Sequence, residues 1–276
     1  MKSTKIILGL ILICFTLISC SKYSKIEKSK DTAYKLVKAD EYYAKKKYRL
    51  AQQLYEGLFP VYKGTEKFED LYYKYAYCFY YQEMYTDAEN LFKGYLEVFP
   101  NSERAEEVDY MRAYCYYKQS AKIELEQVNT VKAMNMMQSY INTHPGSTRN
   151  KDAADIIDKS RLKLEQKEFR AAQLYYNLEK FRASAVSFTN LLNKYPESAK
   201  GEEYKLMVVK SYYRFAKLSV IEKQVERFEK VISEYQDFAD RYPESTLLKD
   251  AEEFNKLSKN QLKEISNEQI TSSAKR

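Results

Sequence analysis

The sequence of 276 residues contains no tryptophan, one histidine, five prolines and six glycines. Strands joined by tight turns need frequent glycine and proline, so this scarcity argues against a β-rich fold. Lysine, glutamate, leucine and alanine are abundant and favour long helices. The sequence therefore predicts an all-α protein. Its 28 tyrosines are the most unusual feature, because a tyrosine ring packs among apolar groups while its hydroxyl faces water.

Signatures of catalysis and metal binding are missing from the sequence. It has no glycine-rich phosphate loop, no nucleophile elbow and no Cys/His cluster with metal-ligand spacing. His144 lies at a predicted helix end, and pairs such as Glu106 with Glu107 lie in predicted first turns, where the helix dipole favours each charge. We therefore expect a non-enzymatic protein with no catalytic residue, no metal and no bound cofactor.

The charge balance points away from nucleic acid. The chain has 46 basic and 39 acidic residues, a formal net charge of +7 that falls to +5 without Lys2 and Lys5 of the amino-terminal segment. The two signs are interspersed along the predicted helices, whereas nucleic-acid binding needs a clustered basic face. We expect neither a nucleic-acid partner nor a small-molecule substrate.

Residues 1–19 have the features of a signal peptide. Two lysines precede an apolar run from Ile6 to Ile18, which is shorter than the roughly 20 residues of a membrane-spanning helix. The following segment resembles the lipobox of bacterial lipoproteins, in which small residues precede an acylated cysteine; it consists of Leu17, Ile18, Ser19 and Cys20. The alternative is an ordinary secreted protein whose signal ends near a cysteine.

The lipobox resemblance implies that cleavage leaves Cys20 as the first residue, carrying a diacylglycerol and a further acyl chain such as palmitate. Several acyl chains hold a protein on a membrane almost permanently. Ser21 follows in place of an acidic residue, which by the same resemblance suits the outer membrane. Residues 20–30 are rich in serine and lysine, and we expect a flexible lipidated tether.

Two cysteines remain after Cys14 leaves with the signal and Cys20 is lipidated. Cys78 and Cys115 occupy matching positions in two similar segments, and such positions in neighbouring repeats lie roughly 10 Å apart. A disulfide requires α-carbons within about 7 Å. We interpret both as small core residues, with a disulfide as the less favoured alternative.

A short sequence motif, predicted to lie between the end of one helix and the start of the next, recurs four times. It contains Pro100 and Ser102, then Pro145 and Ser147, Pro196 and Ser198, and Pro243 and Ser245. Proline stops the preceding helix, and the serine hydroxyl can cap the next one. Each motif therefore predicts a short connection between two helices, which we call a joint.

Small residues precede these joints at the spacing of tetratricopeptide repeats, where two helices cross closely. Ala76 and Ala88 occupy the two small positions before Pro100, and Ala172 and Ser184 occupy them before Pro196. A first repeat fits around Ala39 and Ala51, a third around Ala113 and Ala133 with an insertion near 119–129, and a loose fifth before Pro243.

These repeats predict an all-α, right-handed solenoid of about five tetratricopeptide-like helix pairs with a capping helix at 247–265. Residues 266–276 should form a disordered tail. We expect the paired helices at 32–46, 48–60, 67–82, 85–99, 103–119, 130–143, 148–178, 181–195, 200–218 and 222–242.

The first helices of such repeats line a concave face. That register places an aromatic strip on repeats one to three, formed by Tyr43, Tyr73, Tyr77, Tyr80, Tyr81, Tyr110, Tyr114, Tyr117 and Lys118. Exposed rigid rings with hydroxyls favour binding of a peptide. The alternative is that these tyrosines only pack between repeats.

A lipobox followed by five such repeats resembles the BamD family, the outer-membrane lipoproteins of the β-barrel assembly machinery. The resemblance implies a location on the periplasmic face of the outer membrane and two partners, the periplasmic domains of BamA and unfolded outer-membrane β-barrel proteins. It further implies that repeats one to three (31–146) meet the client and that repeats four and five with the cap (147–265) meet BamA.

Two other classes of lipoprotein or scaffold stay open. A periplasmic scaffold of the Tol-Pal, cell-division or peptidoglycan machinery would share the repeats, although that family usually has an amino-terminal coiled coil and no lipobox. A nutrient-capture lipoprotein with similar repeats would be far larger and use tryptophan to stack on sugars.

Overall fold

The computed structural model describes residues 23–273 of the chain, and all its regular secondary structure over that range is helical. Packing divides the chain into two units, of which unit 1 ends at Ser160 and unit 2 begins at Arg161. The boundary falls inside helix α8 (Asn150–Asn177), after 160 and not after 146, where the sequence separates the two predicted halves. The reason is the length of α8, whose first turns pack on unit 1 through Ala153 and Ile156.

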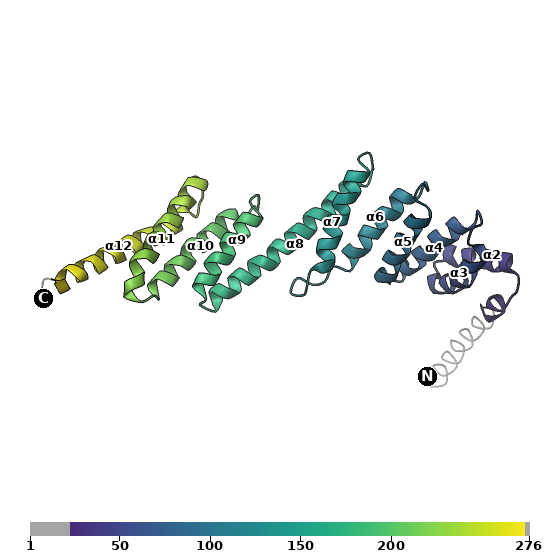
Figure 1. Ribbon diagram of the computed structural model, residues 1–276, viewed down its shortest axis with the longest axis horizontal. Coiled ribbons are helices and arrows are strands. Elements are labelled where there is room, and N and C mark those ends of the chain that lie inside the picture. The colour runs from purple at the N-terminus through teal and green to yellow at the C-terminus, as the bar shows by residue number, and fades with distance from the viewer. Residues whose placement is uncertain (1–22, 274–276) are drawn as a thin grey trace, which may run out of the picture. The chain divides into compact units, whose positions relative to one another are not determined.

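Unit 1 is a stack of antiparallel helix pairs (Figure 1). The helices of its three pairs are α2 (Thr32–Ala44), α3 (Tyr48–Tyr62), α4 (Phe68–Tyr81), α5 (Tyr85–Val98), α6 (Ala105–Lys118) and α7 (Val128–Thr143). From α2 to α7, each helix packs on the next one in the row. The predicted insertion is the loop 119–127 between α6 and α7.

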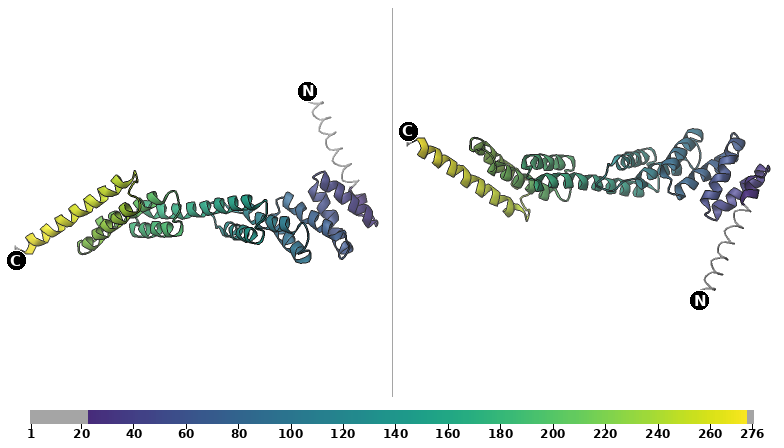
Figure 2. Two further views of the ribbon diagram at one scale, coloured as in Figure 1. Left: turned by 90° about the horizontal axis from the view of Figure 1, so that it is seen from above. Right: turned by 90° about the horizontal axis from the view of Figure 1, so that it is seen from below.

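Unit 2 repeats the arrangement, and Figure 2 shows its helices from two further sides. It contains the end of α8, α9 (Phe181–Lys194), α10 (Gly201–Lys217), α11 (Ile221–Arg241) and α12 (Leu248–Ser273). Helix α12 packs on both α10 and α11, as expected of a capping helix. The predicted all-α class with tetratricopeptide-like helix pairs is therefore confirmed.

The small residues lie where the helices of a pair cross. Ala39, Ala76, Ala88 and Ala172 are fully buried. The hydroxyl of Ser184 on α9 is close enough to α8 to donate a hydrogen bond to the carbonyl oxygen of Ala172 at 3.2 Å. A larger side chain at these positions would force the two helices apart.

The two remaining thiols are core residues, as predicted. Cys78 and Cys115 are buried and unpaired. Burial in apolar surroundings raises the pKa of each thiol to about 12.

The expected flexible tether is wrong for residues 23–27. Residues 23–27 form a helical turn, Ile26 is buried against α2 and α3, and the ring of Tyr23 lies 6.2 Å from that of Tyr42. Tyr23 and Ile26 are three residues apart and therefore share one helix face. The signal segment 1–19 and Cys20 lie outside the described residues.

The expected disordered tail is wrong for residues 266–273, because α12 continues from the predicted end at Ile265 to Ser273, and residues 274–276 lie outside the described residues. Ile265 is buried in the core of unit 2 and anchors the end of the predicted cap. Extending an existing helix avoids the cost of nucleation, so the polar residues that follow can continue it. The other helix ends agree with the predicted ones to within two residues.

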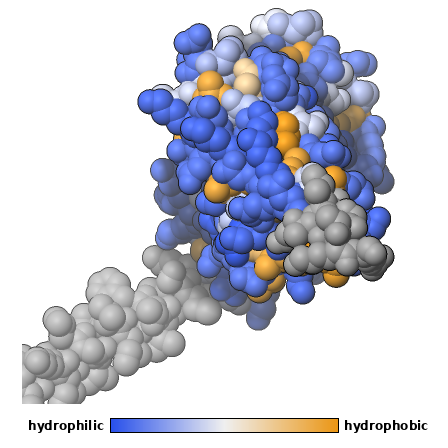
Figure 3. Space-filling model, turned by 90° about the vertical axis from the view of Figure 1, so that its left-hand side faces the viewer, coloured by the Kyte–Doolittle hydropathy of each residue, from blue (hydrophilic) through white to orange (hydrophobic). Residues whose placement is uncertain are grey.

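The surface shown in Figure 3 is mostly hydrophilic, with apolar residues scattered over it. None of the described helices has the length and apolar character needed to cross a bilayer.

Candidate peptide-binding face

The predicted tyrosines come from the first helices of the three repeats in unit 1. On α4, Tyr73, Tyr77 and Tyr80 follow one another at intervals of four and three residues, which places them on one helix face. The same spacing recurs on α6. The three helices stack through the intervening second helices, so their corresponding faces adjoin.

The structure brings the eight predicted rings into one connected cluster, which we call the tyrosine strip. Ring centroids lie 6.4 Å apart for Tyr43 and Tyr81, 5.6 Å for Tyr81 and Tyr77, and 6.3 Å for Tyr80 and Tyr114. The remaining links join Tyr77 to Tyr73, Tyr77 to Tyr80, and Tyr114 to Tyr110 and Tyr117. The strip thus continues from α2 across α4 to α6.

Two members of the strip are buried and cannot present their rings to a peptide. Tyr77 is 5 % exposed and Tyr110 is 6 % exposed. The Tyr77 hydroxyl donates a hydrogen bond to Glu107 at 2.7 Å. Burial, followed by this hydrogen bond, raises the pKa of Tyr77. The expectation of direct binding is therefore wrong for these two rings. The second helix of each pair covers them: the Tyr77 ring packs on Phe92 of α5 and the Tyr110 ring packs on Tyr140 of α7.

The other predicted residues reach the surface to different degrees. Tyr81 is 45 % exposed and Lys118 is exposed. Five rings are half-buried, namely Tyr43, Tyr73, Tyr80, Tyr114 and Tyr117. Half-buried rings are held rigidly by their packed edge while the other edge remains available, which reduces the entropy lost on binding.

Sequence reasoning missed two rings at the edge of the strip. Tyr48 stacks on Tyr81 with ring centroids 4.4 Å apart and an interplanar angle of 20°. Tyr85 lies 5.7 Å from Tyr80, and the ammonium of Lys118 lies 5.5 Å from the Tyr85 ring centroid. Both are the first residue of a second helix, three positions before the small residue of the repeat. That recurrence is a signal that could have identified them.

Arginines from the joints lie over two rings of the strip. The guanidinium of Arg104 is 4.4 Å from the Tyr73 ring centroid and pairs with Asp70 at 3.0 Å. Arg149 repeats this arrangement over Tyr110 at 4.9 Å and lies 3.6 Å from Glu107. Each arginine is thus fixed by a carboxylate on one side and a ring on the other.

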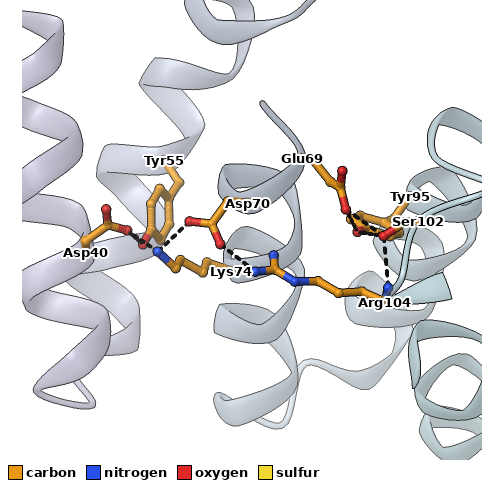
Figure 4. Close-up of polar contacts among 8 residues, drawn as sticks. All are labelled: Asp40, Tyr55, Glu69, Asp70, Lys74, Tyr95, Ser102 and Arg104. Atoms are coloured by element: carbon orange, nitrogen blue, oxygen red, sulfur yellow. Dashed lines mark hydrogen bonds and ion pairs between the residues drawn. The ribbon is translucent and has the colours of Figure 1, made fainter. Parts of the chain in front are cut away.

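A charged row continues beside these contacts (Figure 4). Lys74 on α4 bridges Asp40 at 2.8 Å and Asp70 at 2.6 Å, and Tyr55 donates a hydrogen bond to Asp40 at 2.7 Å. Burial alone would lower the pKa of Lys74, but its hydrogen bonds to the two carboxylates raise it. Lys74 therefore remains charged at neutral pH, and its contacts with Asp40 and Asp70 fix α2 against α4.

Unit 2 has hollows of a different kind. One of about 640 Å³ lies between α10 and α11 and is lined by Tyr212, Phe215 and Arg227 among others. A second, of about 630 Å³, is lined mainly by apolar groups that include Phe181 and Val186. Both volumes are sufficient to receive side chains of a partner.

Large apolar residues are exposed on the same unit. At the turn between α10 and α11, Leu218, Val220 and Ile221 are each more than 60 % exposed. Such a concentration of exposed apolar residues is typical of a protein-binding surface.

No group of three potential metal ligands occurs within residues 23–273.

The sequence matches a known protein family, and the structure resembles a solved one. The sequence model of a family described as YfiO, outer membrane lipoprotein, matches residues 26–227. No curated protein matches the chain. A similar solved structure is the TPR2AB domain of yeast Sti1 in complex with pHSP90, with 11 % identical residues and a TM-score of 0.38 over 83 % of this chain and 98 % of that one.

Proposed function

Because the chain belongs to the YfiO family of outer membrane lipoproteins, we propose that it is a non-enzymatic component of the outer-membrane β-barrel assembly machinery, related to BamD. In this proposal Cys20 carries the lipid that anchors the protein to the periplasmic face of the outer membrane. Unit 1 receives unfolded β-barrel proteins, and unit 2 binds the periplasmic domains of BamA.

The tyrosine strip is the observation that carries the client-binding part of the proposal. A β-barrel protein ends in a strand with aromatic and apolar residues, and half-buried tyrosine rings can stack on such side chains while their hydroxyls meet the peptide backbone. The edge formed by Tyr48 and Tyr81 is the most accessible part of the strip. We expect the terminal strand of a client to bind there.

Replacement of Tyr81 by alanine tests this part directly. We expect Tyr81→Ala to weaken binding of a carboxy-terminal barrel peptide about fivefold to tenfold, measured by fluorescence anisotropy, because a tyrosine that acts as a binding hot spot contributes over about 1 kcal/mol. Tyr34→Ala is the matched control, since Tyr34 lies outside the strip and is 43 % exposed. Equal affinities for the two variants would reject the strip as the client site.

The apolar turn of unit 2 supports a protein partner there. Leu218→Ser combined with Ile221→Ser should reduce recovery of a large barrel protein from detergent-solubilised outer membranes. The control combines Val98→Ser with Val128→Ser, because these residues of unit 1 are also more than half exposed. Recovery of Tol components or cell-wall enzymes in place of a barrel protein would favour the scaffold alternative.

The lipid anchor has its own test. Replacing Cys20 by alanine should move the protein from the membrane pellet to the soluble fraction. Unchanged pelleting after a high-salt wash would count against a lipid on Cys20.

A further inference from the structure

The basic residues of the chain are concentrated near its predicted anchor. Residues 22–49 contain ten lysines and arginines and four acidic residues, a net charge of +6. Residues 51–276 contain 34 basic and 35 acidic residues, a net charge of −1, so the +5 of the chain without residues 1–19 arises entirely in the first segment. The even mixture of signs expected for the whole chain therefore fails for residues 22–49.

Three consecutive lysines form the turn between α2 and α3, which we call the lysine turn (residues 45–47). All three are exposed, and Lys46 adopts a left-handed conformation with φ of 56°. Lys45 is 3.9 Å from Glu41, a long contact, while Glu41 bonds Lys38 at 2.7 Å. Among the described residues, no carboxylate forms an ion pair with Lys46, Lys47 or the nearby Arg49. Over residues 23–273, the charges of Lys46 and Lys47 are thus not neutralised by an ion pair.

The start of the described chain lies beside the lysine turn. The Tyr23 ring packs on Tyr42, which precedes Lys45 by three residues, less than one helical turn. Burial of Ile26 fixes the helical turn that carries Tyr23. Cys20 precedes Tyr23 by three residues, which can span at most about 10 Å. A lipid on Cys20 would therefore hold the lysine turn close to the membrane surface.

We propose that the lysine turn, with Arg49 and Lys25, contacts anionic phospholipid headgroups around the lipid anchor. Exposed ammonium groups attract phosphate oxygens, and each basic residue strengthens binding to an anionic surface when it lies within a Debye length of about 8 Å. The short distance in sequence between Cys20 and Tyr23 and this lipid contact would together fix how the first repeat faces the membrane. The placement rests on the proposed lipidation of Cys20, but the affinity for anionic lipid does not.

Vesicle sedimentation of residues 21–276, which retain every described residue, measures that affinity without the anchor. We expect the protein to bind vesicles of phosphatidylcholine and phosphatidylglycerol at least tenfold more strongly than vesicles of phosphatidylcholine alone. Replacing Lys45, Lys46 and Lys47 by glutamine should reduce binding to the anionic vesicles about tenfold or more. The matched control replaces Lys256, Lys259 and Lys263 of α12, which are also exposed. Equal losses in the two triple variants, or no preference for anionic vesicles, would overturn the proposal.

A proximity measurement on the full lipidated protein provides the second test. A fluorophore attached to Lys46→Cys should be quenched by headgroup-labelled lipid, whereas one attached to Glu83→Cys should not. Glu83 is the matched control, because it occupies the equivalent turn of the next repeat with φ of 61°. The native Cys78 and Cys115 are buried and will not compete for the label. Equal quenching at both sites would contradict the proposal, whereas failure of the protein to float with vesicles would identify a missing lipid on Cys20.

Discussion

The carboxylate of Glu69, in the first turn of α4, accepts a hydrogen bond at 2.5 Å from the hydroxyl of Ser102, which lies 33 residues later in the joint between α5 and α6. Tyr95 near the end of α5 donates to the same carboxylate at 2.8 Å. The Ser102 oxygen also accepts from the backbone amide of Arg104 (Figure 4). One serine thus joins the start of one repeat to the start of the next.

The same contact occurs at every joint. The corresponding pairs are Glu106 with Ser147, Glu165 with Ser198, and Glu202 with Ser245. In each joint the serine oxygen also accepts from the backbone amide two residues later. The predicted serine cap is therefore wrong for α6 and α10, whose N-caps are Arg104 and Lys200 without a side-chain hydrogen bond. The serine organises the turn ahead of the helix and ties that turn to the preceding repeat.

Removal of the joint carboxylate should destabilise unit 1. We expect Glu69→Ala to lower the free energy of unfolding by about 1 kcal/mol, because hydrogen bonds to a partly exposed charged group contribute at the low end of their range. Glu103→Ala, at an exposed position in the same joint, should change it by less than about 0.5 kcal/mol. Urea denaturation followed by circular dichroism measures both. Equal midpoints would show that the Ser102 contact contributes no stability.

The joint carboxylates should also make stability depend on pH. Hydrogen bonds from Ser102 and Tyr95 lower the pKa of Glu69 below 4.5, and those from Ser147 and Tyr140 act likewise on Glu106. A lowered folded-state pKa means that the stabilisation is present above the unfolded value and is lost as pH falls through the folded value. We expect the urea midpoint to fall between pH 5 and pH 3, and to fall less steeply in Glu69→Ala. Identical slopes would contradict this origin.

Local signals in the sequence predict most of the fold. Proline at a joint and alanine at a helix crossing act over a few residues. As predicted, Pro100 lies between α5 and α6, and Ala76 is fully buried. The pairing of Glu69 with Ser102 depends on the stacking of repeats, so neither residue signals it alone. Tyr23 and Ile26 form too short an apolar pattern to reveal their docking on α2 and α3.

The sequence predicts which tyrosines form the candidate face but does not predict which of their rings are exposed. Helical spacing correctly groups Tyr77 with Tyr81, but it does not determine which ring the next helix covers. That depends on contacts such as the one between Tyr77 and Phe92, whose ring centroids lie 5.2 Å apart. Exposure of a tyrosine is therefore a property of the stacked pairs and not of one helix.

Two glycines in helices should respond oppositely to alanine. A Cβ on Gly94 would lie 2.3 Å from the hydroxyl oxygen of Tyr72, whose ring is held against Phe59 and Tyr95, whereas a Cβ on Gly57 would meet nothing within 4 Å. We expect Gly94→Ala to destabilise by about 1–3 kcal/mol and Gly57→Ala to stabilise by about 0.5–1 kcal/mol. Urea midpoints of both variants check this. Stabilisation by Gly94→Ala would mean that Tyr72 moves aside freely.

Tyr77 and Tyr81 share one face of α4 but should differ in role. Tyr77 is buried against Phe92, so Tyr77→Ala leaves a cavity and should cost about 3–5 kcal/mol. Tyr81 is 45 % exposed, and its loss should cost less than about 1 kcal/mol while weakening peptide binding.

Tyr77→Phe separates the ring from the hydroxyl of Tyr77. Phenylalanine keeps the packing on Phe92 and removes only the hydrogen bond to Glu107, which retains its contact with Arg149 at 3.6 Å. We therefore expect a loss of about 1 kcal/mol in the free energy of unfolding, with unchanged affinity for the barrel peptide. A large loss of affinity in Tyr77→Phe at full helicity would instead mean that the Tyr77 hydroxyl reaches the client, because packing of the ring is preserved in that variant.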